Sequence, residues 1–176
     1  IATRAPHIGD PTLRGVLLAE VASAREVEGD VDGALALLRE ASALPAGRWR
    51  LLELQERLAR KHGRAAELIE ALEGRAVLAG AIARGEDQGQ NSGTFAVKRF
   101  ADAEGASIES AALWREAARL RATALADGAG AVQGYGQALA IRPDDLLLRQ
   151  ERMLACEVAG DLEGAAADAQ ALVAAG

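Results

Sequence analysis

Helix-breaking dipeptides recur at a fixed spacing along this chain, and that spacing constrains the fold more than any other feature. Gly29-Asp30 and Gly63-Arg64 lie 34 residues apart, and so do Ala126-Asp127 and Gly160-Asp161. The segments between these breaks carry apolar residues at helical spacing. Two helices per period of this length indicate a helical repeat, in which each helix pair buries its apolar face against its neighbours.

The amino-acid composition favours helices and disfavours strands. The 176 residues include 42 Ala and 24 Leu, which are strong helix formers, whereas aromatic residues make up only 3% of the chain. β-Branched and aromatic residues are too scarce for a β-rich fold. No apolar run approaches the roughly 20 residues that cross a bilayer. We therefore expect an all-α fold without membrane insertion. The sequence leaves the compartment open, and the cytoplasm is favoured.

Charge and residue usage exclude several classes of function. The net charge of −6 argues against nucleic-acid partners. Cys156 is the only cysteine, and His7 and His62 are the only histidines. These three residues suggest neither a zinc site nor a Cys/His nucleophile pair, and we expect no cofactor, no metal and no catalysis.

A glycine-rich stretch at residues 128–134 superficially resembles a dinucleotide-binding loop. That chemistry needs a strand before the loop, so that the turn delivers the pyrophosphate to a helix N-terminus. Residues 114–125, which precede the stretch, have a helical pattern instead. We interpret these glycines as an inter-helix turn followed by small packing residues.

The pattern of breaks and caps predicts the individual helices. Asp10-Pro11 is a helix start, because the carboxylate can cap and proline suits the first helical position. Gly74 weakens the case for one straight helix in its segment. Ser107 or Ser110 is expected to cap the helix that reaches Ala126. The expected segments are 10–28, 31–43, 48–62, 64–82, 130–141, 146–159 and 162–174, with a loop at 84–94 and a short helix near 95–100.

The chain resembles the tetratricopeptide-repeat family, most clearly at Ala131-x-x-x-Tyr135-x-x-Ala138-Leu139-x-Ile141-x-Pro143-Asp144-Asp145. The resemblance implies an all-α solenoid of antiparallel helix pairs in a right-handed superhelix. The units would span residues 12–46, 47–82, 110–145 and 146–176 of a single domain. An irregular linker would occupy residues 83–109, where the spacing of the breaks departs from the period. We expect the chain to be a piece of a longer protein, because it begins with Ile1 and ends without a polar closing helix.

The resemblance also implies where a ligand would bind, since family members contact ligands from particular positions of each first helix. These positions are Val16, Ala19, Ser23, Glu26 and Val27 in the first unit, Arg50, Glu53, Arg57, Arg60 and Lys61 in the second, Leu113, Glu116, Leu120, Thr123 and Ala124 in the third, and Leu147, Gln150, Leu154, Glu157 and Val158 in the fourth. The chaperone-tail clamp of some relatives requires Lys and Asn where Ala19 and Ser23 stand, so we do not expect that ligand.

Residues 48–64 contain six basic and two acidic side chains, a local excess of positive charge in an acidic chain. Helical geometry places residues 50, 53, 57, 60, 61 and 64 opposite the Leu51, Leu54 and Leu58 stripe. One interpretation is an ordinary solvated face. The other is a groove that attracts an acidic segment or a terminal carboxylate, since arginine binds carboxylates in bidentate geometry.

Two functions fit these observations. The first is a non-enzymatic interaction or scaffold module that binds a peptide or partner protein in a helical groove. The second is a structural or regulatory segment of a larger bacterial enzyme or signalling protein, with no ligand of its own. The apolar last helix also predicts that the ends of the solenoid are open to self-association.

Overall fold

The computed structural model describes residues 9–44, 47–89 and 92–175. The expected N-terminal tail with His7, and Pro45-Ala46 of the turn after the second helix, lie outside these ranges. The described residues contain helices and no strand. The helices are α1 (Pro11–Val27), α2 (Val31–Ser42), α3 (Arg48–Lys61), α4 (Ala65–Ala83), α5 (Thr94–Arg99), α6 (Ala103–Ala124), α7 (Gly128–Ile141), α8 (Leu146–Ala159) and α9 (Leu162–Ala175).

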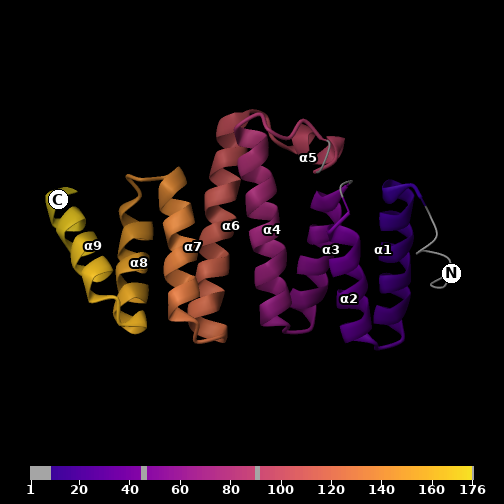
Figure 1. The fold of residues 1–176 in the computed structure, drawn as a ribbon, viewed down its shortest axis with the longest axis horizontal. Helices are drawn as coiled ribbons and strands as arrows, with labels where there is room; N and C mark the ends of the chain where they lie inside the picture. Colours follow the sequence, from indigo (N-terminus) through magenta and orange to yellow (C-terminus); the bar gives the residue numbers. More distant parts are fainter. Residues whose placement is uncertain (1–8, 45–46, 90–91, 176) are drawn as a thin grey trace.

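All helices except α5 stand side by side in one row, in which each packs on its neighbours along the chain (Figure 1). Both ends of the row are single helices, α1 and α9. Each helix pair therefore contacts only the pairs before and after it, which is the arrangement of a solenoid. The predicted all-α solenoid is confirmed, while the handedness of its superhelix stays a prediction.

Aspartate caps begin most of these helices, because a carboxylate can accept the first free backbone N–H groups. Asp10 accepts from the Thr12 N–H at 2.8 Å, as predicted, and Pro11 is the first helical residue. The prediction for α6 was wrong, since Asp102 caps this helix at Ala103. The serines expected as caps, Ser107 and Ser110, lie inside the helix, and the buried Ser110 hydroxyl donates to the Ala76 carbonyl at 2.8 Å.

Small residues let the helices approach one another closely. Ala34, Ala76, Ala117 and Ala138 are 0% exposed at the interfaces between neighbouring helices. Gly74 serves the same purpose in α4, which runs through it without a break. A Cβ atom at position 74 would lie 3.0 Å from both terminal methyl groups of the Leu52 side chain on α3, and the glycine therefore makes room for that side chain.

The irregular middle of the chain consists of two long helices, α4 and α6, and the segment between them, residues 84–102, which we call the insertion. Helices α4 and α6 pack on each other, and both rise above the rest of the row to carry α5 (Figure 1). We expected residues 84–94 to be an unanchored loop. In its described part the buried Asp87 carboxylate accepts the Gly89 and Ser92 N–H groups, each at 2.8 Å. This segment therefore has a polar anchor.

Candidate functional site

Ion pairs tie the first helices of the four units into one surface, which we call the first-helix face. Lys61 Nζ on α3 lies 2.7 Å from Glu26 Oε1 on α1. Arg60 on α3 lies 3.0 Å from Glu116 on α6. The final link is a bidentate pair between Arg115 on α6 and Glu151 on α8, with distances of 2.7 and 2.8 Å. The first-helix face therefore runs across α1, α3, α6 and α8.

The basic side chains of α3 are largely neutralised by carboxylates of this chain. Arg60 also pairs with Glu56 at 2.8 Å, and Arg64, just after the helix, pairs with Asp32 at 2.6 Å. The hydrogen bond from Lys61, helped by the charge of Arg57 4.0 Å away, lowers the pKa of Glu26 despite its partial burial. A partner carboxylate would have to compete with these internal pairs.

The other predicted contact residues are distributed unevenly over the fold. Arg50 is exposed on the rim of a cleft between α1 and α3. Leu113 is buried in the core at 6% exposure, so a partner cannot reach it, and Leu120 packs half-buried against the same core. Gln150 and Glu157 are exposed on α8.

The cleft between α1 and α3 is a largely apolar concave surface of the first-helix face. It encloses about 490 Å³. Val16 on its wall is 51% exposed, although it is a large apolar side chain. The lining residues are Thr12, Gly15, Val16, Ala19, Glu20, Ser23, Gly47, Arg50, Leu51 and Leu54. Three predicted first-unit positions, Val16, Ala19 and Ser23, therefore meet at one cleft.

A second cleft, of about 360 Å³, lies between α6 and α8 and is rich in arginine. Its basic lining residues are Arg115, Arg119 and Arg142, and Ile108 and Leu148 add apolar surface. Arg142 lies 3.8 Å from Asp145. Arg119 is exposed and forms no ion pair with the residues that the structure describes. This cleft also contains Glu116, which pairs with Arg60 on α3. Because α3 also forms one wall of the first cleft, both clefts belong to the first-helix face.

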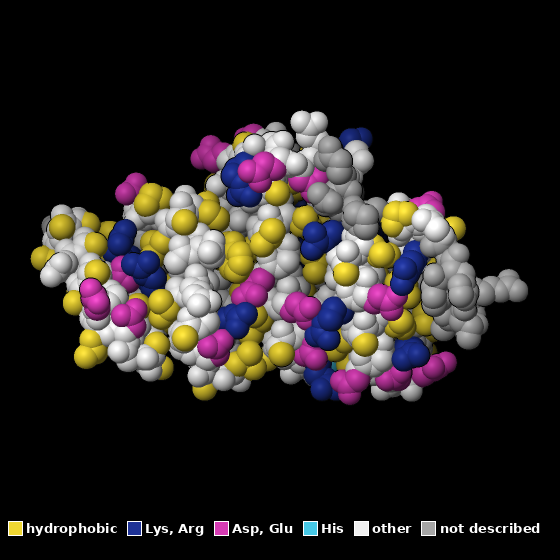
Figure 2. Space-filling view, viewed as in Figure 1, with side chains coloured by type: hydrophobic (Ala, Val, Ile, Leu, Met, Phe, Trp, Pro, Cys, Tyr) yellow, Lys and Arg dark blue, Asp and Glu magenta, His cyan; other side chains and the backbone are white. Residues whose placement is uncertain are grey.

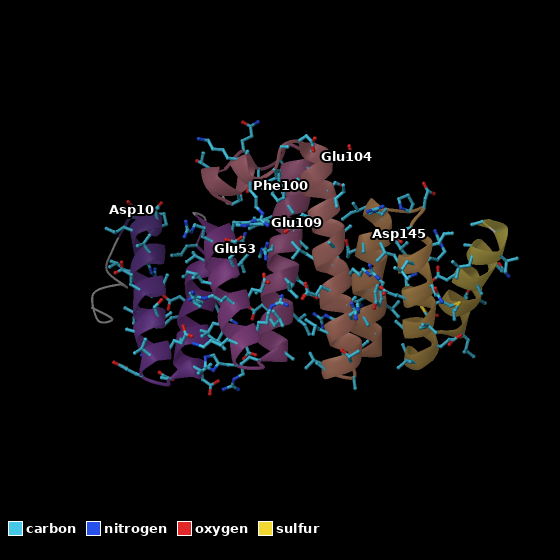
Figure 3. All side chains as sticks on the ribbon, turned by 180° about the vertical axis from the view of Figure 1, so that it is seen from behind. Asp10, Glu53, Phe100, Glu104, Glu109 and Asp145 are labelled. Carbon is cyan, nitrogen blue, oxygen red and sulfur yellow. The ribbon has the colours of Figure 1, made fainter. Side chains whose placement is uncertain are left out.

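A buried charged cluster joins α3, α4 and α6 below α5. Arg75 is only 8% exposed; it pairs with Glu56 and lies 3.1 Å from Glu109. Its guanidinium stacks over the Trp49 ring, with 4.7 Å from Cζ to the ring centroid. Figure 3 shows Glu53, Phe100 and Glu109 gathered at this place.

The insertion closes the cluster from above. Phe100 meets the Trp49 ring edge-on with 5.5 Å between the ring centroids, and Arg99 lies 3.8 Å from Glu53 and 3.7 Å from Glu109. With Arg60 paired to Glu56, three arginines thus compensate three glutamates under an aromatic cover, as in a structural core rather than an open site. Sequence reasoning missed Arg75, although a lone arginine in the apolar stretch 75–83 is a signal that a buried partner exists.

Within the described ranges, no three His, Cys, Asp or Glu side chains gather in a way that could hold a metal ion. Cys156 is buried, and this burial raises the pKa of its thiol. None of the described helices has the length and apolarity needed to cross a bilayer. On the face shown in Figure 2, basic and acidic side chains are interspersed and form no large field of one sign.

Comparisons with known proteins add little to this description. No protein-family model matches the chain, and no curated protein matches it. Among solved structures, the crystal structure of MamA protein aligns over 96% of this chain and 93% of its own, with 16% sequence identity and a TM-score of 0.35. A TM-score at this level carries no argument about fold or function. The all-α solenoid therefore rests on the described helices themselves.

Proposed function

We propose that this chain is a non-enzymatic interaction module that binds a peptide or a partner protein on its first-helix face. The observation that carries the proposal is the apolar cleft between α1 and α3, where Val16 is 51% exposed. Its volume of about 490 Å³ is in the range of clefts that accept ligand groups. Burial of one Leu or Phe side chain of a partner there would contribute about 1.5–3 kcal/mol.

The second cleft suggests which charge the partner carries. The α6–α8 cleft presents Arg115, Arg119 and Arg142, and Arg119 is exposed without an ion pair in the described part of the chain. A carboxylate of the partner would gain a charge-assisted hydrogen bond there. We therefore favour an acidic segment with an apolar residue, contacting α1–α3 and α6–α8 at the same time.

Selection from a displayed library of random peptides would test this function. We expect the enriched peptides to combine apolar and acidic residues. Their affinity should fall at least tenfold in Val16→Asp, which places a charge in the apolar cleft, and severalfold in Arg119→Glu. Val77→Asp is the matched control, because Val77 is also about half exposed, at 54%, belongs to α4 and not to a first helix, and lines neither cleft.

A second candidate function is a structural or regulatory segment with no ligand of its own. The observation that favours it is the neutralisation of Arg60, Lys61 and Arg64 by carboxylates within the chain. If the selection enriches no peptide, or if Val16→Asp and Val77→Asp weaken binding equally, this second function becomes the better account.

A further inference from the structure

An apolar groove runs along α4, apart from the two clefts described above. It consists of two hollows, of about 560 and 420 Å³, and both are lined by Val77 on α4 and Trp114 on α6. Its α4 side is a single stripe of residues at helical spacing, namely 66, 69, 70, 73, 77, 80 and 84. The remaining lining residues come from α6 and α7 in one hollow, and from α3 and the end of α6 in the other. We call this surface, to which Arg48, Val77, Trp114, Leu125 and Ile141 belong, the α4 groove.

The α4 groove is apolar although it is open to solvent. Val77 is 54% exposed, and Leu125 is 43% exposed. The α4 stretch 76–83 contains no polar side chain, so this part of the helix is apolar around its whole circumference. A helix of that kind is normally covered on every side. Helices α3 and α6 cover α4 on two sides, whereas the groove leaves another side open. Such an exposed apolar surface indicates an interaction site.

The position of the α4 groove in the row shows that no further repeat can cover it. Helices α1, α2 and α3 stand on one side of α4, and α8 and α9 stand beyond α7 on the other (Figure 1). A repeat that continued the row would pack on the first or the last helix pair, because each unit of a solenoid contacts only its neighbours. The groove is therefore a surface of the middle of the row, and whatever covers it comes from outside the row.

Arg48, at the start of α3, gives the α4 groove a positive charge. Its Nε donates to the Ser42 carbonyl at 2.8 Å, which fixes the guanidinium at the end of α2. Its two terminal amino groups have no hydrogen-bond or ion-pair partner among the described residues. The other charged lining residues all have ionic partners, namely Glu70 with Arg39, Glu73 with Arg121, and Arg84 with Glu86. The free edge of Arg48 therefore suits a carboxylate from outside, which it can bind with two parallel hydrogen bonds.

We propose that the α4 groove is the docking site for an acidic amphipathic helix of a partner protein. The apolar stripe of that helix packs on Val77, Trp114 and Leu125, and one of its carboxylates binds Arg48. A helix suits the site because the groove follows α4, whose 19 residues are about 28 Å long, and because an amphipathic helix places its apolar face in a groove between helices. Charge complementarity selects an acidic helix, since Arg48 is the lining charge that the described chain leaves unpaired.

The α4 groove shares no lining residue with either cleft of the first-helix face. On α6, Trp114 and Arg121 line the groove, whereas Arg115 and Arg119 line the α6–α8 cleft, so the two sites use different sides of this helix. The proposal therefore does not depend on the function proposed above. Substitutions on one surface serve as controls for the other.

A displayed library of helical peptides of about the length of α4 is the appropriate probe, with a fixed apolar stripe and with Glu, Lys, Gln or Ala at the flanking positions. We expect the enriched peptides to carry Glu beside the stripe. Their affinity should fall about tenfold or more in Val77→Asp, which places a charge in the apolar groove, and severalfold in Arg48→Glu. Val16→Asp and Arg119→Glu make the same changes on the first-helix face and should leave the affinity unchanged. Thermal melts verify that all four variants remain folded.

Tryptophan emission shows where a peptide binds. The two tryptophans of the chain are Trp49, which is 0% exposed, and Trp114, which is half-buried in the α4 groove. A peptide without aromatic residues should therefore shift the emission to shorter wavelength when it covers Trp114. The proposal is overturned if no peptide is enriched, if the enriched peptides leave the emission unchanged, or if Val16→Asp and not Val77→Asp weakens their binding. The last result would support the first-helix face instead. A dimer that Val77→Asp dissociates in sedimentation velocity would also overturn it, because a second copy would then occupy the groove.

Discussion

We expect the substitution Arg75→Met to destabilise the protein strongly. The arginine side chain is 8% exposed and stands between Glu53, Glu56 and Glu109, whose side chains are 32%, 17% and 30% exposed. Methionine preserves most of the length and the contact with the Trp49 ring. It removes the charge, however, and leaves three partly buried carboxylates. Among the described residues their remaining cations are Arg99, beside Glu53 and Glu109, and Arg60, beside Glu56.

The expected loss of stability follows from the burial of Arg75 and the partial exposure of its three carboxylate partners. Removal of one partner of a buried ion pair costs about 3–5 kcal/mol, because the remaining charge is left without compensation. The carboxylates here keep partial contact with water, so we place the loss at the lower end, about 3 kcal/mol. In a domain of this size, each kcal/mol lowers Tm by about 2–4 °C, which gives a decrease of roughly 6–12 °C.

Thermal unfolding followed by circular dichroism would measure this loss. Arg84→Met is the control, because Arg84 is 61% exposed, lies at the end of the same helix and, among the described residues, forms an ion pair with the exposed Glu86 alone. We expect Arg84→Met to change Tm by less than about 2 °C. Addition of Glu53→Gln and Glu109→Gln to Arg75→Met should restore much of the stability, since it removes the uncompensated charge. A Tm decrease of under about 2 °C for Arg75→Met would refute the reasoning.

Three further predictions concern caps, close packing and pH. Asp145→Ala should lower the free energy of unfolding by about 1 kcal/mol, because Asp145 caps α8, whereas Asp144→Ala should not. Thermal melts should also show that Gly134→Ala destabilises, since its Cβ would lie 2.9 Å from a Cβ of α6, while Gly136→Ala, with open space, stabilises by about 0.5–1 kcal/mol. The lowered pKa of Glu26 means that its stabilising effect is present above its ordinary value of 4.5 and is lost as the pH falls through the lowered value. The stability difference between the wild type and Glu26→Gln, measured by urea unfolding, should therefore be constant near neutral pH and shrink in acid.

Sequence reasoning located the helix boundaries where the determining interactions are local. Gly29, Gly63 and Gly160 all have positive φ, with values of 84°, 66° and 78°, so each is a position at which glycine ends a helix. The cap of α6 was missed because Asp102 stands in a polar stretch that also offers two serines. The sequence alone does not show which of Asp102, Ser107 and Ser110 caps the helix, since the position of the cap depends on how far α6 extends along α4.

The departure from the 34-residue period has a structural cause that the sequence did not reveal. Helix α4 runs over Ala65–Ala83 and α6 over Ala103–Ala124, both longer than α2 at Val31–Ser42. Their extra length supports α5 and its cover over Trp49. The placement of α5 over Trp49 depends on contacts between segments far apart in the chain. Such contacts cannot be predicted from the periodicity of the sequence.

The basic stripe of α3 shows why a repeat protein is hard to interpret from charge alone. The sequence left open whether this stripe is a solvated face or a binding groove, and much of its charge is answered by Glu26, Asp32 and Glu116 of the neighbouring units. In a solenoid each unit binds its neighbours with the same chemistry that it would use for an outside partner. An excess of one charge on a helix therefore does not identify an external site. The more informative sign is a charged side chain that lacks a counterpart among the described residues, as Arg119 does in the α6–α8 cleft.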